Sequence, residues 1–131
     1  MKNLAKLVGI IAFVAVIGFL VIACDDGDGG LIDGSWDRGD IVVTFNGSSG
    51  VFTEISSNSG WYSLLNNGTV SIGDRKFRNI TYKNNSTWSG QELTYQGYST
   101  TWEDTTITIS GSTLKTDTPN ASPSTNTYTR K

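Results

Sequence analysis

The clearest strand pattern in the chain is IVVTFNGSSGVFTEI, residues 41–55. Its two ends, residues 41–45 and 51–55, are rich in β-branched and aromatic side chains, which are typical of strands. The five residues between them are only Asn, Gly and Ser, the residues that tight turns favour. The segment therefore predicts a β-hairpin.

The same pattern of short strands and turns continues to the end of the chain. No stretch after residue 31 repeats apolar side chains at helical spacing. A second hairpin is predicted across Asn66-Asn67-Gly68, because Asn and Gly accept the positive φ of a tight turn. A loop carrying Pro119 and Pro123 precedes the last strand, since proline cannot donate to a sheet ladder. The predicted strands are residues 61–65, 69–73, 76–82, 91–95, 98–102, 105–110, 112–115 and 126–130.

Short strands that follow one another in sequence predict an all-β fold. The expected architecture is a small antiparallel up-and-down β-barrel of about eight to ten strands. Closing the sheet into a barrel would remove the exposed edges that invite aggregation. A sandwich of two β-sheets is the alternative that the same strands allow.

The N-terminus has the pattern of an export signal. Lys2 and Lys6 precede residues 7–23, which carry no charged side chain, and the only cysteine follows at Cys24. Val21-Ile22-Ala23-Cys24 resembles the lipobox of bacterial lipoproteins. The resemblance implies a signal peptide over residues 1–23, cleavage before Cys24, and fatty acyl groups on Cys24 that anchor the chain to a membrane.

An uncleaved helix is the alternative, because 17 apolar residues lie at the lower edge of what spans a bilayer. Both interpretations place the rest of the chain outside the cytoplasm, in the cell envelope, periplasmic or on the surface. Residues 24–33, rich in Asp and Gly, are expected to form a flexible tether, and residues 34–131 one domain. Residues 25–30 have the alternating Asp and Gly of a calcium loop but lack the Glu that closes one.

The charge of the exported chain excludes some partners. All twelve acidic residues lie at or beyond Asp25, and eight of the ten basic residues follow the signal, so the exported net charge is near −4. Nucleic acid and anionic lipid surfaces are therefore poor partners. The one basic cluster is expected to form a solvated face and comprises Arg75, Lys76, Arg78 and Lys83.

Two residues near the ends of the domain carry a resemblance to a known family. Gly34-Ser35-Trp36 opens the domain, and Arg130 lies one residue from its end. This pattern resembles the lipocalins and related calycin barrels, and residues 34–131 look like the small lipocalin-like domains of bacterial lipoproteins. The resemblance implies that Arg130 packs across the indole of Trp36 and closes one end of the barrel. It also implies binding of a small apolar or amphipathic ligand.

Catalytic chemistry has little support in this composition. The chain has no histidine and no free thiol beside Cys24, which excludes Ser-His and Cys-His nucleophiles and the common zinc sites. The acidic pairs Asp37 with Asp40 and Glu103 with Asp104 fall in predicted turns or strand ends, where acids are ordinarily solvated. We therefore expect neither an enzyme, nor a cofactor, nor a metal site.

The aromatic side chains remain as candidates for binding. Those expected to line a cavity are Trp61, Trp88, Trp102 and Tyr95. They could instead stack on sugars as an exposed platform, with Trp88 the most exposed, or simply pack in the core. The leading hypothesis is a membrane-anchored binding module for a small ligand. The alternative is an envelope or surface protein that binds a protein or glycan through its strand edges and loops.

Overall fold

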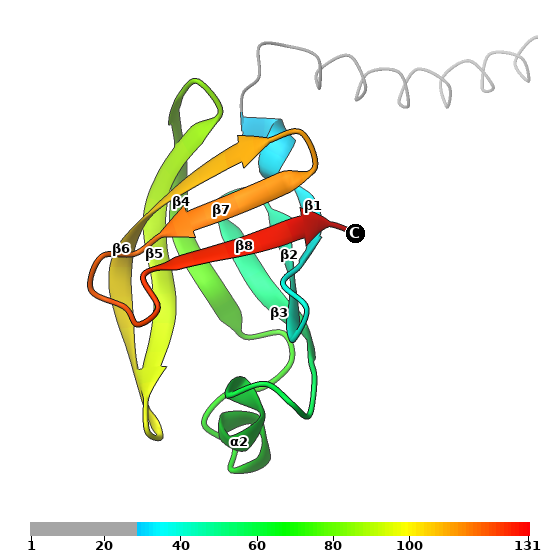
Figure 1. Cartoon of the computed structure of the whole chain (residues 1–131), viewed down its shortest axis with the longest axis vertical. Helices are drawn as coiled ribbons and strands as arrows, with labels where there is room; N and C mark the ends of the chain where they lie inside the picture. Colours follow the sequence, from blue (N-terminus) through cyan, green and yellow to red (C-terminus); the bar gives the residue numbers. More distant parts are fainter. Residues whose placement is uncertain (1–28) are drawn as a thin grey trace, which may run out of the picture.

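The computed structural model describes residues 29–131, which form a closed antiparallel barrel of eight strands (Figure 1). The strands follow one another around the barrel in sequence order, and β1 pairs with β8 to close it. The predicted all-β barrel is thus confirmed, and the sandwich is not formed. The strands are β1 (Gly34–Asp37), β2 (Ile41–Asn46), β3 (Ser49–Ile55), β4 (Arg75–Asn84), β5 (Thr87–Gln96), β6 (Ser99–Ser110), β7 (Thr113–Asp117) and β8 (Thr125–Arg130).

Two short helical segments accompany the strands and mark the two ends of the barrel. The 3₁₀ segment η1 (Gly29–Ile32) precedes β1, and the helix α2 (Trp61–Asn66) connects β3 to β4. Figure 1 shows η1 and the β4–β5 hairpin at the upper end, and α2 and the β5–β6 hairpin at the lower end. We call these the η1 end and the α2 end. Among residues 29–131, no helix is long and apolar enough to cross a bilayer.

One apolar core fills the barrel and extends to α2, whose Trp61 and Leu64 belong to it. Inward-facing residues alternate with outward-facing ones along the strands, as on β6, where Thr105, Ile107 and Ile109 are buried and the residues between them are exposed. Aromatic rings meet across the interior, with the Phe77 centroid 5.1 Å from that of Phe45 and 6.3 Å from that of Tyr128. These contacts fix the width of the barrel around a packed interior.

The predicted hairpin of residues 61–65 and 69–73 is wrong. Residues 61–66 form α2, whose Trp61 and Leu64 are three positions apart and are both buried. The turn residues end this helix, since the Asn67 amide donates to the Ser63 carbonyl and Gly68 has a φ of 84°. The Asn-Gly pair therefore serves a helix C-terminus here instead of a strand turn.

Two further strand predictions differ from the structure. Residues 98–102 and 105–110 were expected to be separate strands, yet they form the single strand β6. The long strand is held by β5, which pairs with it without a break from Thr87↔Thr108 to Gln96↔Ser99. The two segments therefore count once, and the barrel has eight strands.

The predicted signal peptide (residues 1–23), the lipidated Cys24 and residues 25–28 of the tether lie outside the described residues. The last part of the predicted tether, however, contacts the barrel. Ile32 is fully buried, and the Asp33 carboxylate accepts a hydrogen bond of 3.0 Å from the Gly47 amide. The folded unit therefore starts before Gly34.

Candidate functional site

The η1 end of the barrel is closed by Trp36 and Arg130. The guanidinium carbon of Arg130 lies 4.1 Å from the centroid of the Trp36 indole, whose Nε1 donates to the Ile32 carbonyl at 2.9 Å. Arg130 also donates to the carbonyls of Asp33, at 3.0 Å, and Leu31, at 2.6 Å. These contacts tie η1 across this end of the barrel and leave Trp36 fully buried.

The structure explains why a glycine, Gly34, begins the Gly-x-Trp pattern. Gly34 has a φ of 117°, which side chains rarely adopt, and a Cβ there would lie 3.1 Å from Nη1 of Arg130. A side chain at this position would therefore strain the backbone and press on the cation that covers Trp36.

The α2 end holds a cavity of about 600 Å³. Its walls come from α2, the β1–β2 turn, the β5–β6 hairpin, the β7–β8 loop and the inner faces of the strands above them. Most of its lining residues carry polar side chains, in contrast to the apolar core beside it. The lining residues are Arg38, Trp61, Lys76, Glu92, Thr94, Tyr95, Gln96, Ser99, Thr100, Thr101, Glu103, Asn120, Ala121, Ser122, Pro123 and Asn126.

A buried ion pair forms the inner wall of this cavity. The Lys76 ammonium donates to Glu92 at 2.6 Å and to the Leu93 carbonyl at 2.7 Å, and both charged side chains are only 2% exposed. The Thr118 hydroxyl donates to the other oxygen of Glu92. Burial lowers the pKa of Lys76 to about 8, and the nearby Glu92 carboxylate opposes this shift. The expected solvated face over residues 75–83 is therefore wrong for Lys76, because its charge is satisfied inside the barrel.

A second ion pair lies in the turn between β1 and β2. Nε and Nη2 of Arg38 both donate to the Asp40 carboxylate at 2.7 Å, and the Ser59 hydroxyl donates to the same carboxylate at 2.7 Å. The bond from Arg38 holds the pKa of Asp40 below its usual value, and the Ser59 bond acts in the same direction against partial burial. Arg38 thus reaches the cavity with its charge already neutralised.

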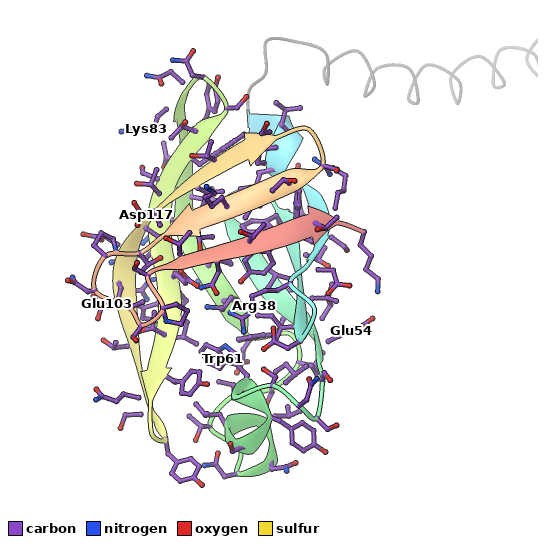
Figure 2. All side chains as sticks on the ribbon, in the orientation of Figure 1. Arg38, Glu54, Trp61, Lys83, Glu103 and Asp117 are labelled. Carbon is purple, nitrogen blue, oxygen red and sulfur yellow. The ribbon has the colours of Figure 1, made fainter. Side chains whose placement is uncertain are left out.

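Two aromatic side chains contribute apolar surface to the cavity. Trp61 and Tyr95 meet edge to face, with centroids 4.5 Å apart and an interplanar angle of 65°. Trp61 is buried against Phe52, whereas Tyr95 is 39% exposed. Figure 2 shows Trp61 where α2 meets the barrel. A side chain at Gly60 would collide with the Tyr95 hydroxyl, so this glycine permits the contact.

The other two candidate tryptophans lie away from the cavity. Trp88 pairs with Ile107 in the core, 5.2 Å from the ring of Tyr82, and is 1% exposed. The expectation of an exposed Trp88 is therefore wrong, because its strand position faces inward. Trp102 is half-buried on the outer wall, with the Arg78 guanidinium 4.1 Å from its ring centroid. Of the four candidates, the structure brings only Trp61 and Tyr95 to the cavity.

The acidic pairs noticed in the sequence do not converge as catalytic pairs. Asp40 is bound to Arg38, whereas Asp37 accepts a hydrogen bond from the Gly39 amide in the same turn. Glu103 lines the cavity, and the next residue, Asp104, is exposed on the outer face of β6. Across residues 29–131, no three His, Cys, Asp or Glu side chains gather as metal ligands.

The buried pair of Lys76 and Glu92 in the cavity wall was missed by sequence reasoning. Lys76 and Glu92 each lie within a predicted strand, a position where charged side chains are uncommon. A charged residue inside a predicted strand was therefore the one sequence feature that pointed to this pair. The register of β4 with β5, which sets Phe77 opposite Glu92, was needed to bring the two charges together.

Comparison with known proteins found no matching family model, no matching curated protein and no matching solved structure.

Proposed function

We propose that this chain is a binding module that holds a small amphipathic molecule in the cavity at its α2 end. The observation that carries the proposal is the contrast between the two ends of the barrel. Trp36, Arg130 and η1 close one end. The other end keeps a cavity of about 600 Å³, within the range of small-molecule sites.

The composition of the cavity wall favours an amphipathic ligand over a purely apolar one. Tyr95, Ala121 and Pro123 offer apolar surface, while Gln96, Thr101 and Asn126 offer hydrogen bonds. A purely apolar molecule would leave these polar groups without water and without partners, which is unfavourable.

The proposal includes attachment to a membrane through Cys24, with the barrel outside the cytoplasm in the cell envelope. The sequence Val21-Ile22-Ala23-Cys24 after a basic and apolar segment supports it. A non-enzymatic role accompanies it, because the chain has no histidine, Asp40 is bound to Arg38, and Glu103 and Asp104 face opposite sides of β6.

The test is native mass spectrometry of the full chain, purified without detergent from its own host's envelope in lipid nanodiscs. Two variants on β6 give a matched comparison. Thr101→Trp fills the cavity from its wall, whereas Thr108→Trp adds the same bulk to an exposed outer position. We expect a stoichiometric small molecule on the wild type and on Thr108→Trp, and its loss from Thr101→Trp.

An empty wild-type cavity, or equal occupancy in both variants, would contradict the proposal. That result would favour the envelope interaction protein instead. The closed barrel leaves no free strand edges, so such a protein would bind its partner through loops. The β5–β6 hairpin is one of these loops, and its Tyr98 is 66% exposed.

A further inference from the structure

We infer that the cavity at the α2 end selects a cationic ligand, a small organic amine whose ammonium group binds the carboxylate of Glu103. The inference rests on the proposed function and adds to it the charge and the chemical class of the ligand. It follows from the ion pairs of the cavity wall and from the position of Glu103 on β6.

The cations of the cavity wall are already neutralised by protein carboxylates. Within the lining, the positive side chains are Arg38 and Lys76. Arg38 is held by two bonds to Asp40, and Lys76 by its bond to Glu92. An anionic ligand would therefore have to displace a carboxylate from one of these pairs. The pair of Lys76 and Glu92 is buried, which makes this displacement costly.

Glu103 is the carboxylate of the wall without such a partner. It forms no ion pair with any of residues 29–131, and its one hydrogen bond is a long one, 3.4 Å from the Asn120 side-chain nitrogen. Together, Arg38, Lys76, Asp40, Glu92 and Glu103 therefore leave one negative charge at the cavity.

The position of Glu103 aims this charge inward. The residues that follow it at intervals of two, Thr105, Ile107 and Ile109, are all buried inside the barrel, and Glu103 continues their series into the cavity. Its direct partner across the ladder is Glu92. Because Lys76 already pairs with Glu92, Glu103 is the carboxylate of this cross-strand pair that is left for a cation.

The remaining wall suits the apolar part of such an amine. Tyr95 is half-exposed at the edge of the cavity, and Ala121 and Pro123 line it from the β7–β8 loop. An aromatic or short aliphatic group could pack on these side chains while its ammonium reaches Glu103. The excess of acidic residues in the chain also favours the approach of a cation.

The experiment compares three probes of similar shape and different charge by isothermal titration calorimetry. The probes are 2-phenylethylamine, 2-phenylethanol and 3-phenylpropanoate, added to the full chain in nanodiscs of zwitterionic lipid. We expect the amine to bind at least about tenfold more tightly than the alcohol, the effect of one hydrogen bond to a charged group. The anion should bind more weakly than either.

The variants assign this preference to one carboxylate. Glu103→Gln should bind the amine and the alcohol equally. Glu54→Gln removes the same charge from an exposed side chain on the opposite side of the barrel (Figure 2) and should keep the preference. Glu103→Lys is a gain-of-function check and should now favour the anion, which a merely misfolded variant would not do.

An amine that binds no better than the alcohol, or a preference that survives Glu103→Gln, would overturn the inference. In that case, the proposed function would still stand if the wild type binds the alcohol and Thr101→Trp does not. Failure of all three probes to bind would count against both.

Discussion

Lys76 and Glu92 place a charged, hydrogen-bonded pair beside the apolar core of a small barrel. Removing two charges from water is costly, and their mutual attraction repays this only with good geometry and further hydrogen bonds. The pair has both, since Leu93 and Thr118 supply the additional partners. Neither burial nor pairing could be predicted from the sequence, because the two residues are 16 positions apart and meet only through the β4–β5 register.

Removing one partner of this pair should lower the free energy of unfolding far more than replacing both partners with apolar residues. Lys76→Met should lower the free energy of unfolding by about 3–5 kcal/mol, because Glu92 remains buried without a counter-charge. The double variant Lys76→Met with Glu92→Leu should recover most of that loss, since no uncompensated charge is left. Urea denaturation of the two single variants and the double variant measures the coupling.

Lys115→Met is the matched control, because Lys115 is exposed on β7 and its loss should change stability by less than about 0.5 kcal/mol. If Lys76→Met were as mild as this control, or the double variant no more stable than Lys76→Met, the buried pair would not have the energetic role described.

At the scale of single elements, sequence reasoning succeeded where local pattern and tertiary structure agree. The hairpin of β2 and β3 was predicted because its strands and turn are both unambiguous. Residues 61–65 failed because a short run of apolar and aromatic residues fits a strand as well as a helix. The helix is selected by packing of Trp61 and Leu64 against the barrel, which a local pattern does not contain.

The segment η1 should depend on Arg130. Arg130→Ala removes two hydrogen bonds to carbonyls before β1 and the cation over Trp36. Because the guanidinium is exposed, we expect a loss of about 1–2 kcal/mol in the free energy of unfolding. Hydrogen exchange should quicken at the amides of residues 30–33 and stay unchanged in α2.

Arg75→Ala is the control for this effect, since Arg75 is an exposed arginine on β4. Arg130→Lys keeps the positive charge but cannot donate to both carbonyls as the guanidinium does. Its free energy of unfolding should therefore lie between those of the wild type and Arg130→Ala. Unchanged exchange at residues 30–33 in Arg130→Ala would show that η1 is held without Arg130, by the burial of Ile32 and by its other hydrogen bonds.

At the scale of the whole molecule, the barrel has one sealed end and one open, charged end. The closed topology was predictable, because many short sequential strands without a helix leave few other architectures. The cavity was not, since it depends on four separate segments, α2, the β5–β6 hairpin, the β7–β8 loop and the β1–β2 turn. Only Trp61 and Tyr95 among the predicted binding residues line it, because burial of the other aromatics depends on the direction each side chain takes from its strand.

The proposed ligand site is the cavity at the α2 end. The most direct measurement is a ¹H–¹⁵N NMR titration of the full chain in nanodiscs with 2-phenylethanol, a probe that does not depend on the charge preference of Glu103. We predict shifts confined to the amides of the cavity wall, at residues 38, 61, 76, 92, 94–96, 99–101, 103, 120–122 and 126, with none at residues 31–36 or 110–113 around the sealed end. Shifts that gather at the sealed end, or that scatter over the outer faces of the strands, would contradict the account.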